Sequence, residues 1–146
     1  MNFFEQELRR ILGKSEILQQ QRYVGNACYG TIGNDIRAKL AFATCGTSDP
    51  YEAIRATILN RTEGPVDKMV FRFRDILGIK QVSNPNFRDG VKPHIWTYRD
   101  KTDWYEYHPN EADYNKLSKT LNDYMEVFQP QMSQSEKLDM GEMQLQ

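Results

Sequence analysis

Cysteine and long hydrophobic runs are scarce in this sequence. Only two of the 146 residues are cysteines, Cys28 and Cys45, which is too few for a disulfide framework, and no Cys-x-x-Cys or Cys/His spacing is typical of a zinc site. No apolar run approaches the roughly 18 residues of a transmembrane helix, and acidic residues stand where a signal peptide has basic ones. We therefore expect a cytoplasmic protein without a metal or other cofactor, outside the membrane, whose cysteines are small buried side chains.

A strong net charge and the familiar catalytic motifs are also absent. The chain has 19 basic and 20 acidic residues and a formal charge of −1, so its overall field gives no support for binding to nucleic acid or membranes. No Gly-x-Ser-x-Gly elbow, His-Glu-x-x-His pair, P-loop or Gly-x-Gly-x-x-Gly fingerprint occurs. The sequence therefore does not indicate a particular reaction.

Two amphipathic helices are predicted near the ends of the chain. Asn2 can cap a helix over residues 2–12, and Gly13 offers a C-terminal stop. A second helix follows Asn110 and ends before Pro130. The apolar residues at helical spacing are Phe4, Leu8, Ile11 and Leu12 in the first helix, and Tyr114, Leu117, Leu121, Tyr124 and Phe128 in the second.

Between these helices apolar residues recur at every second position, which is typical of half-buried strands. Apolar and polar residues alternate over residues 36–42 and 68–74, and residues 24–30 are expected to pair with the first of these segments. Residues 51–60 fit a helix or a strand. The turn at residues 62–65, which leads directly into the next strand, favours a strand.

The most aromatic stretch, residues 93–108, is predicted to form a β-hairpin, preceded by a segment over residues 75–92 that is mostly loop. With the turn centred on residues 100–101, Trp96 would lie opposite Tyr105. The side chains that would then share one face of the hairpin are His94, Trp96, Tyr98, Tyr105 and Tyr107.

Short connections between strands require antiparallel pairing. We therefore expect an α+β fold, an antiparallel meander sheet of four to six strands with the N-terminal and C-terminal amphipathic helices packed on it. The alternative is a pleckstrin-homology-like barrel closed by the C-terminal helix. Residues 1–130 would form a single domain, and residues 131–146, rich in Gln, Met and Ser, a disordered polar tail.

Three functions remain open, and a non-enzymatic protein-interaction module is favoured because the other two lack parts they require. The aromatic, Met and Arg residues of the chain are the types enriched in the cores of protein interfaces. The partner would be another protein or a second copy of the chain.

The first alternative is binding of single-stranded nucleic acid through an aromatic and basic hairpin, because bases stack on aromatic rings and phosphates attract cations. The near-zero net charge argues against it. The candidate binding residues are Arg72, Arg74, Arg88, Lys92, His94, Trp96, Tyr98, Tyr105 and Tyr107.

The second alternative is an enzyme that uses His94 or His108 as a general base. Histidine titrates near neutral pH, and a neighbouring carboxylate such as Asp103 or Glu106 would orient it. The expected hairpin register does not bring His94 beside either acid, so no catalytic residue is assigned.

The stretch over residues 75–90, followed by Pro93-His94-Ile95-Trp96-Thr97-Tyr98, resembles a family of short uncharacterised proteins of Gram-positive gut bacteria, often encoded beside mobile-element genes. The opening Met1-Asn2-Phe3-Phe4-Glu5 and residues 59–64 add to the resemblance, which covers about residues 1–128. It implies a bacterial, cytoplasmic setting. No activity, cofactor or site residue is known for the family, so none is carried over.

Overall fold

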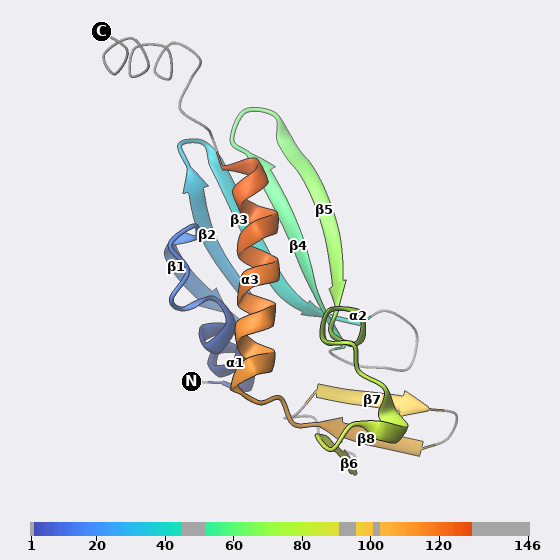
Figure 1. Ribbon diagram of the computed structural model, residues 1–146. Coiled ribbons are helices and arrows are strands. Elements are labelled where there is room, and N and C mark those ends of the chain that lie inside the picture. The colour runs from blue at the N-terminus through green and yellow to red at the C-terminus, as the bar shows by residue number, and fades with distance from the viewer. Residues whose placement is uncertain (1, 45–51, 91–95, 101–102, 130–146) are drawn as a thin grey trace, which may run out of the picture.

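The computed structural model describes residues 2–44, 52–90, 96–100 and 103–129, with the backbone alone for residues 98–100. Figure 1 shows a large sheet behind a long helix and a small sheet below it. In chain order the elements are α1 (Phe3–Leu12), β1 (Gln19–Val24), β2 (Ala27–Gly33), β3 (Ile36–Ala43), β4 (Ala53–Asn60), β5 (Gly64–Arg72), α2 (Phe73–Leu77), the 3-10 turn η1 (Gln81–Ser83), β6 (Phe87–Asp89), β7 (Trp96–Asp100), β8 (Asp103–Tyr107) and α3 (Glu111–Phe128).

The large sheet is an antiparallel meander in the order β1-β2-β3-β4-β5, and the small sheet has the order β6-β8-β7. This confirms the predicted α+β class, and the segment over residues 51–60 is a strand, as favoured, from residue 53 to residue 60, with residue 51 outside the described residues. The large sheet does not close into a barrel, so the pleckstrin-homology-like alternative is wrong. The physical reason is that α3 packs along the face of the sheet, where its apolar stripe is covered without any pairing between β1 and β5 (Figure 1).

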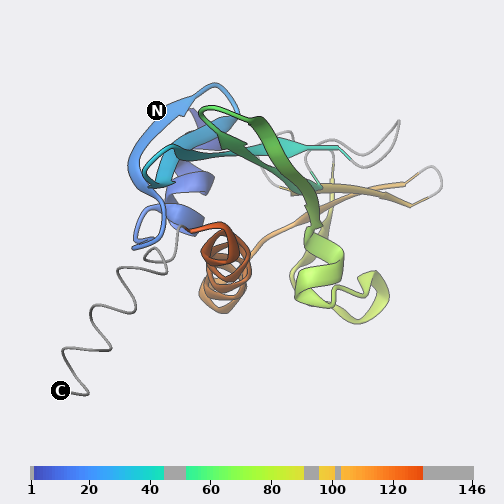
Figure 2. The same ribbon diagram turned by 90° about the horizontal axis from the view of Figure 1, so that it is seen from above.

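Both predicted terminal helices are present, with the expected caps. The Asn2 side chain accepts a hydrogen bond from the Glu5 backbone N–H at 2.7 Å, and Asn110 forms a reciprocal capping box with Asp113. The two helices lie against the same face of the large sheet (Figure 2). Their buried residues, Leu8, Ile11, Leu12, Leu117, Leu121 and Met125, form one hydrophobic cluster with Ile32, Leu40, Ile54 and Ile58 of the sheet.

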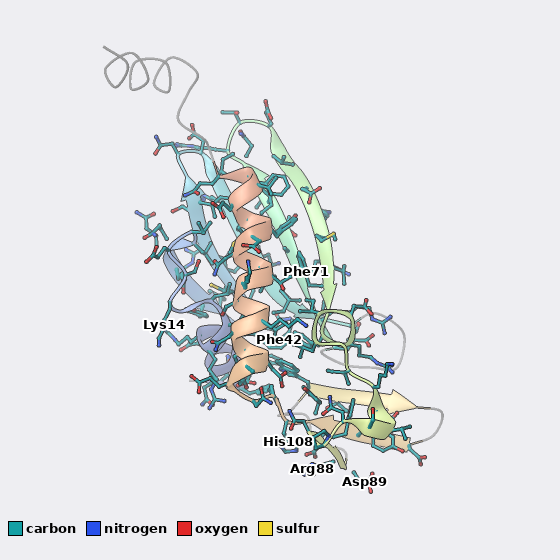
Figure 3. All side chains as sticks on the ribbon, in the orientation of Figure 1. Lys14, Phe42, Phe71, Arg88, Asp89 and His108 are labelled. Carbon is teal, nitrogen blue, oxygen red and sulfur yellow. The ribbon has the colours of Figure 1, made fainter. Side chains whose placement is uncertain are left out.

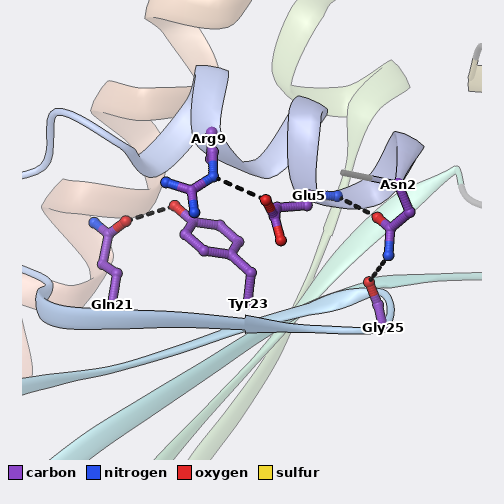
Figure 4. A network of polar contacts seen from close by, with 6 residues as sticks. All are labelled: Asn2, Glu5, Arg9, Gln21, Tyr23 and Gly25. Atoms are coloured by element: carbon purple, nitrogen blue, oxygen red, sulfur yellow. Dashed lines mark hydrogen bonds and ion pairs between the residues drawn. The ribbon is translucent and has the colours of Figure 1, made fainter.

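A polar network joins α1 to the edge strand β1 (Figure 4). The Arg9 guanidinium pairs with Glu5 at 3.2 Å and lies 4.3 Å above the Tyr23 ring, and the Tyr23 hydroxyl donates to Gln21 at 2.5 Å. Tyr23 is therefore held on the helix side of β1. Because side chains alternate along a strand, its neighbour Arg22 projects from the other side of the sheet.

The hairpin register differs from the prediction by two residues. Trp96 pairs with Tyr107, not Tyr105, and Asp100 pairs with Asp103. A two-residue shift keeps every side chain on its predicted face, so the hydrophobic pattern alone does not distinguish the registers. The observed register brings Trp96 and Tyr107 together, with their ring centroids 5.9 Å apart.

The described part of the predicted loop, residues 75–90, contains more regular structure than expected. The short helix α2 begins at Phe73, inside the strand predicted over residues 68–74, and ends at Leu77, where Gly78 with a φ of 63° forms the left-handed C-cap. The strand β6 has three residues and is formed only by pairing with β8. Both elements are too short to produce a readable period. The predicted tail over residues 131–146 lies outside the described residues.

Candidate functional site

The two central rings of the predicted hairpin site are core side chains. Trp96 and Tyr107 have exposed fractions of 0% and 1%. The Trp96 ring stacks on Phe73 with a centroid separation of 4.0 Å and an interplanar angle of 10°, and the Tyr107 hydroxyl donates to Asp113 at 2.8 Å. These rings have no face available for a nucleic-acid base.

The three predicted arginines lie on three different elements, β5, α2 and β6. Arg72 pairs with the buried Glu52 at 3.0 Å, and Arg74 lies on α2. Arg88 donates to backbone carbonyls of its own segment, those of Pro85 and Phe87 (Figure 3).

Three members of the predicted site cannot be compared with the structure. Lys92 and His94 lie outside the described residues, as does the side chain of Tyr98. Tyr105 is half-buried, and its ring meets the edge of Phe87.

His108 stands beside a carboxylate, as a general base would require. Its Nε2 lies 3.2 Å from Oε2 of Glu106, and Glu106 is 7% exposed (Figure 3). The ring borders a hollow of about 500 Å³ whose other lining residues include Glu7, Arg10 and Tyr114. The structure therefore places His108 next to a buried acid, an arrangement that was not predicted from the sequence.

The polar groups across this hollow serve the packing of α1 against α3. The Tyr114 hydroxyl donates to Oε1 of Glu7 at 2.6 Å and accepts from Arg10 at 3.2 Å. Burial raises the pKa of the Glu7 carboxyl above its ordinary value, and burial also raises the pKa of Tyr114. Among the described residues, no cluster of three or more His, Cys, Asp or Glu side chains could hold a metal ion.

A different surface carries a concentration of positive charge that was not predicted from the sequence. α1 and α3 cover one face of the large sheet, and no described helix or strand covers the other (Figure 2). We call this second surface the open face. Its central row consists of residues paired directly across all five strands, namely Arg22, Tyr29, Lys39, Thr57 and Lys68.

Two further cations flank the central row on the open face. Arg37 lies two residues before Lys39 on β3 and pairs with Leu59, whereas Arg55 lies on the other side of the row and pairs with Val70. Arg72 pairs with Ala53 and so belongs to the same face, but it is neutralised by Glu52 at 3.0 Å. We call the others, Arg22, Arg37, Lys39, Arg55 and Lys68, the five outward cations.

No acidic residue on the described strands balances these cations on the open face. The outward positions of the five strands contain no Asp or Glu. Among the described residues, none of the five outward cations has an ion-pair partner within 4.0 Å. A chain with a net charge of −1 thus presents one strongly basic surface.

Tyr29 lies within this basic surface. Arg22 and Lys39 approach its ring, with the Arg22 Cζ 5.4 Å and the Lys39 Nζ 5.6 Å from the ring centroid. Two hollows of about 400 Å³ each indent the same face. One is lined in part by Arg22, Tyr29, Arg37 and Leu59, and the other by Lys39, Arg55, Lys68 and Val70.

In comparisons with known proteins, no family model, no curated protein and no solved structure matches this chain. The resemblance to short bacterial proteins therefore stays a prediction. None of the described helices combines the length and the apolar character needed to cross a membrane.

Proposed function

We propose that the protein binds nucleic acid through the phosphate backbone, on the open face of the large sheet. The observation that carries the proposal is the group of five outward cations without an acidic partner among the described residues. Lysine and arginine side chains that neutralise phosphates release counterions, and this release dominates the affinity of such complexes. The local charge of the surface matters here more than the net charge of the chain.

The spacing of the cations supports a polyanionic ligand. In the central row, the neutral residues Tyr29 and Thr57 separate the cations, which therefore lie two strand spacings, about 10 Å, apart. This distance is close to the screening length of about 8–10 Å at physiological salt. The fields of neighbouring cations therefore overlap over the face, and a ligand with several linked negative charges benefits from all of them.

An acidic protein is the rival ligand for the same surface, and it corresponds to the interaction module that the sequence favours. Lysine is depleted from the cores of protein interfaces, whereas arginine is enriched there. Here a lysine, Lys39, occupies the middle of the open face, where it pairs with Tyr29 and Thr57 of the central row. This central lysine favours nucleic acid over a protein partner.

The catalytic alternative at His108 has weaker support. The contact with Glu106 supplies the orienting acid that a general base needs. The remaining polar groups of that hollow, Glu7, Arg10 and Tyr114, hydrogen-bond or pair with one another. These groups hold α1 and α3 together, and none of them is assigned to bind the electrophilic atom of a substrate.

The proposal is tested by fluorescence anisotropy with a labelled single-stranded 20-nucleotide DNA of mixed sequence. If five phosphates are neutralised, the logarithm of the affinity falls with a slope of about −3.5 against the logarithm of salt concentration, which is roughly 100-fold weaker binding for a fourfold rise in salt. The variant R37E/R55E should lose at least about tenfold in affinity and show a slope nearer −2.

The matched control is K80E/K116E, which changes the net charge equally at two exposed lysines away from the open face. Its affinity should stay close to that of the wild type. Equal losses in the two variants, or binding that does not respond to salt, would contradict the proposal. Capture of an acidic protein that competes with DNA only weakly would favour the rival ligand.

A further inference from the structure

The tyrosines whose side chains are described fall into two groups, four that are held by their hydroxyl and two, Tyr29 and Tyr105, that are not. Tyr105 lies in the small sheet, where its ring meets the edge of Phe87. Tyr23, Tyr107, Tyr114 and Tyr124 each donate their hydroxyl hydrogen to an amide or carboxylate side chain. Tyr29 is half-buried, and its hydroxyl has no hydrogen-bond partner among the described residues. Its side chain points away from the buried neighbour Cys28 and into the open face. Packing and hydrogen bonding in the core therefore do not account for this aromatic ring.

We infer that the nucleic acid bound on the open face is single-stranded, that its backbone crosses the strands along the central row, and that one base stacks on Tyr29. The inference rests on the proposed function and names the ligand of the same surface. A base in any single strand offers a flat π-face, so stacking on an aromatic side chain tolerates any sequence. Arg22 and Lys39, which lie over the Tyr29 ring in the structure, would move off it to admit the base and would contact the phosphates on either side of the stacked base.

The shape of the sheet favours a single strand over a duplex. The large sheet arches over α1 and α3, so the open face is its outer, convex surface (Figure 2). Double-stranded DNA is stiff, with a persistence length of about 50 nm, and it would touch a convex surface along one narrow line. Reading its major groove requires a projecting helix or two-stranded ribbon, and no described element projects from this face (Figure 2).

The arrangement of cations also matches a flexible chain that crosses the strands. The central row extends over all five strands, a distance of about 19 Å at the usual strand spacing. Arg37 and Arg55 lie on opposite sides of that row, so cations border the path on both sides. The two hollows, one beside Tyr29 and one beside Lys68, give room for bases along the same path.

The test is a set of ring variants at a fixed salt concentration. Y29F keeps the ring and should bind a 12-nucleotide single strand within about twofold of the wild type. Y29L removes the ring and should bind the same strand about 5- to 100-fold more weakly, which is the range for loss of one base–aromatic stack. Because Y29L removes no charge, its salt dependence should equal that of the wild type. Thermal unfolding of each variant checks that the fold is retained.

Two further probes separate stacking from charge. An abasic strand of the same length keeps every phosphate and loses the bases, so it should bind the wild type about as weakly as Y29L binds the normal strand, and Y29L should bind both strands alike. A 12-base-pair duplex should bind the wild type more weakly than the single strand. Equal binding of duplex and single strand, or equal binding by Y29L and the wild type, would overturn the inference.

These outcomes are distinguishable from failure of the proposed function. If Y29L binds normally while R37E/R55E loses salt-dependent affinity, the open face binds nucleic acid without stacking, and only the inference fails. If neither single strand nor duplex binds the wild type at low salt, the proposed function fails as well.

Discussion

Tyr114 of α3 donates its hydroxyl hydrogen to Oε1 of Glu7 of α1 at 2.6 Å, and Glu7 is only 8% exposed. This bond joins helices whose contacting residues are 107 positions apart in the chain. It also keeps a carboxylate inside the molecule. Burial is the main influence on the Glu7 carboxyl and raises its pKa, although Tyr114 and Arg10 act in the opposite direction.

The first prediction concerns pH and Glu7. Because the pKa of Glu7 is higher in the folded than in the unfolded protein, its contribution to stability is fully present below the unfolded value of about 4.5 and is lost as pH rises through the folded value. The wild type should therefore lose stability relative to the neutral variant E7Q as pH rises from about 4 to 7. The urea midpoint of E7Q minus that of the wild type should increase over this range. Urea unfolding across this range measures the difference, and a difference that does not change with pH would contradict the assignment.

The second prediction concerns the hairpin rings. Because Trp96 is fully buried and stacks on Phe73, W96A should lower the free energy of unfolding by about 3–5 kcal/mol. The milder variant W96F keeps a ring in the core. At a temperature where W96F is folded, its affinity for single-stranded DNA should equal that of the wild type. A loss of affinity in folded W96F would instead assign binding to the hairpin.

The third prediction concerns Cys28. Its side chain is buried, as the sequence predicts, and burial raises the pKa of the thiol to about 11. Only the thiolate reacts rapidly with disulfide reagents. In a C45S background, the native protein at pH 8 should therefore react slowly with a disulfide reagent, and the unfolded protein at once. Rapid reaction of the native protein would show that Cys28 is more accessible than the fold implies.

The sequence predicts the terminal helices and the meander because their signals are local. Asn2 and Asn110 stand at the caps, and the apolar spacing along each helix marks the face that packs on the sheet. The hairpin register could not be derived in the same way. Registers that differ by two residues place Trp96 on the same face, and the long-range stacking of Trp96 on Phe73 distinguishes them.

The open face was missed for a related reason. Its five outward cations come from four different strands, between residues 22 and 68, and the acidic residues elsewhere in the chain cancel their charge in the total. A signal was nevertheless present. On the predicted strand over residues 36–42, Arg37 and Lys39 occupy the polar face, with no acid between them. Counting the charges on each face of the predicted meander, rather than along each segment of the chain, would have revealed the basic surface.

By contrast, the most aromatic part of the sequence does not belong to the open face. It covers residues 93–108, where the sequence suggested a binding surface. In the structure, Trp96 and Tyr107 build the core between the small sheet, α2 and α3. The ring on the basic surface is Tyr29, a single aromatic side chain in an unremarkable strand.

The location of binding is tested most directly by NMR spectroscopy of the wild-type protein titrated with an unlabelled single-stranded 12-mer. The account predicts that the largest changes in backbone amide shifts fall on the open face, at residues such as Tyr29, Lys39 and Arg55, whereas Lys116 on α3 changes little. Changes that concentrate instead on β7 and β8, or on the hollow between His108 and Tyr114, would contradict the claim that the open face is the binding surface.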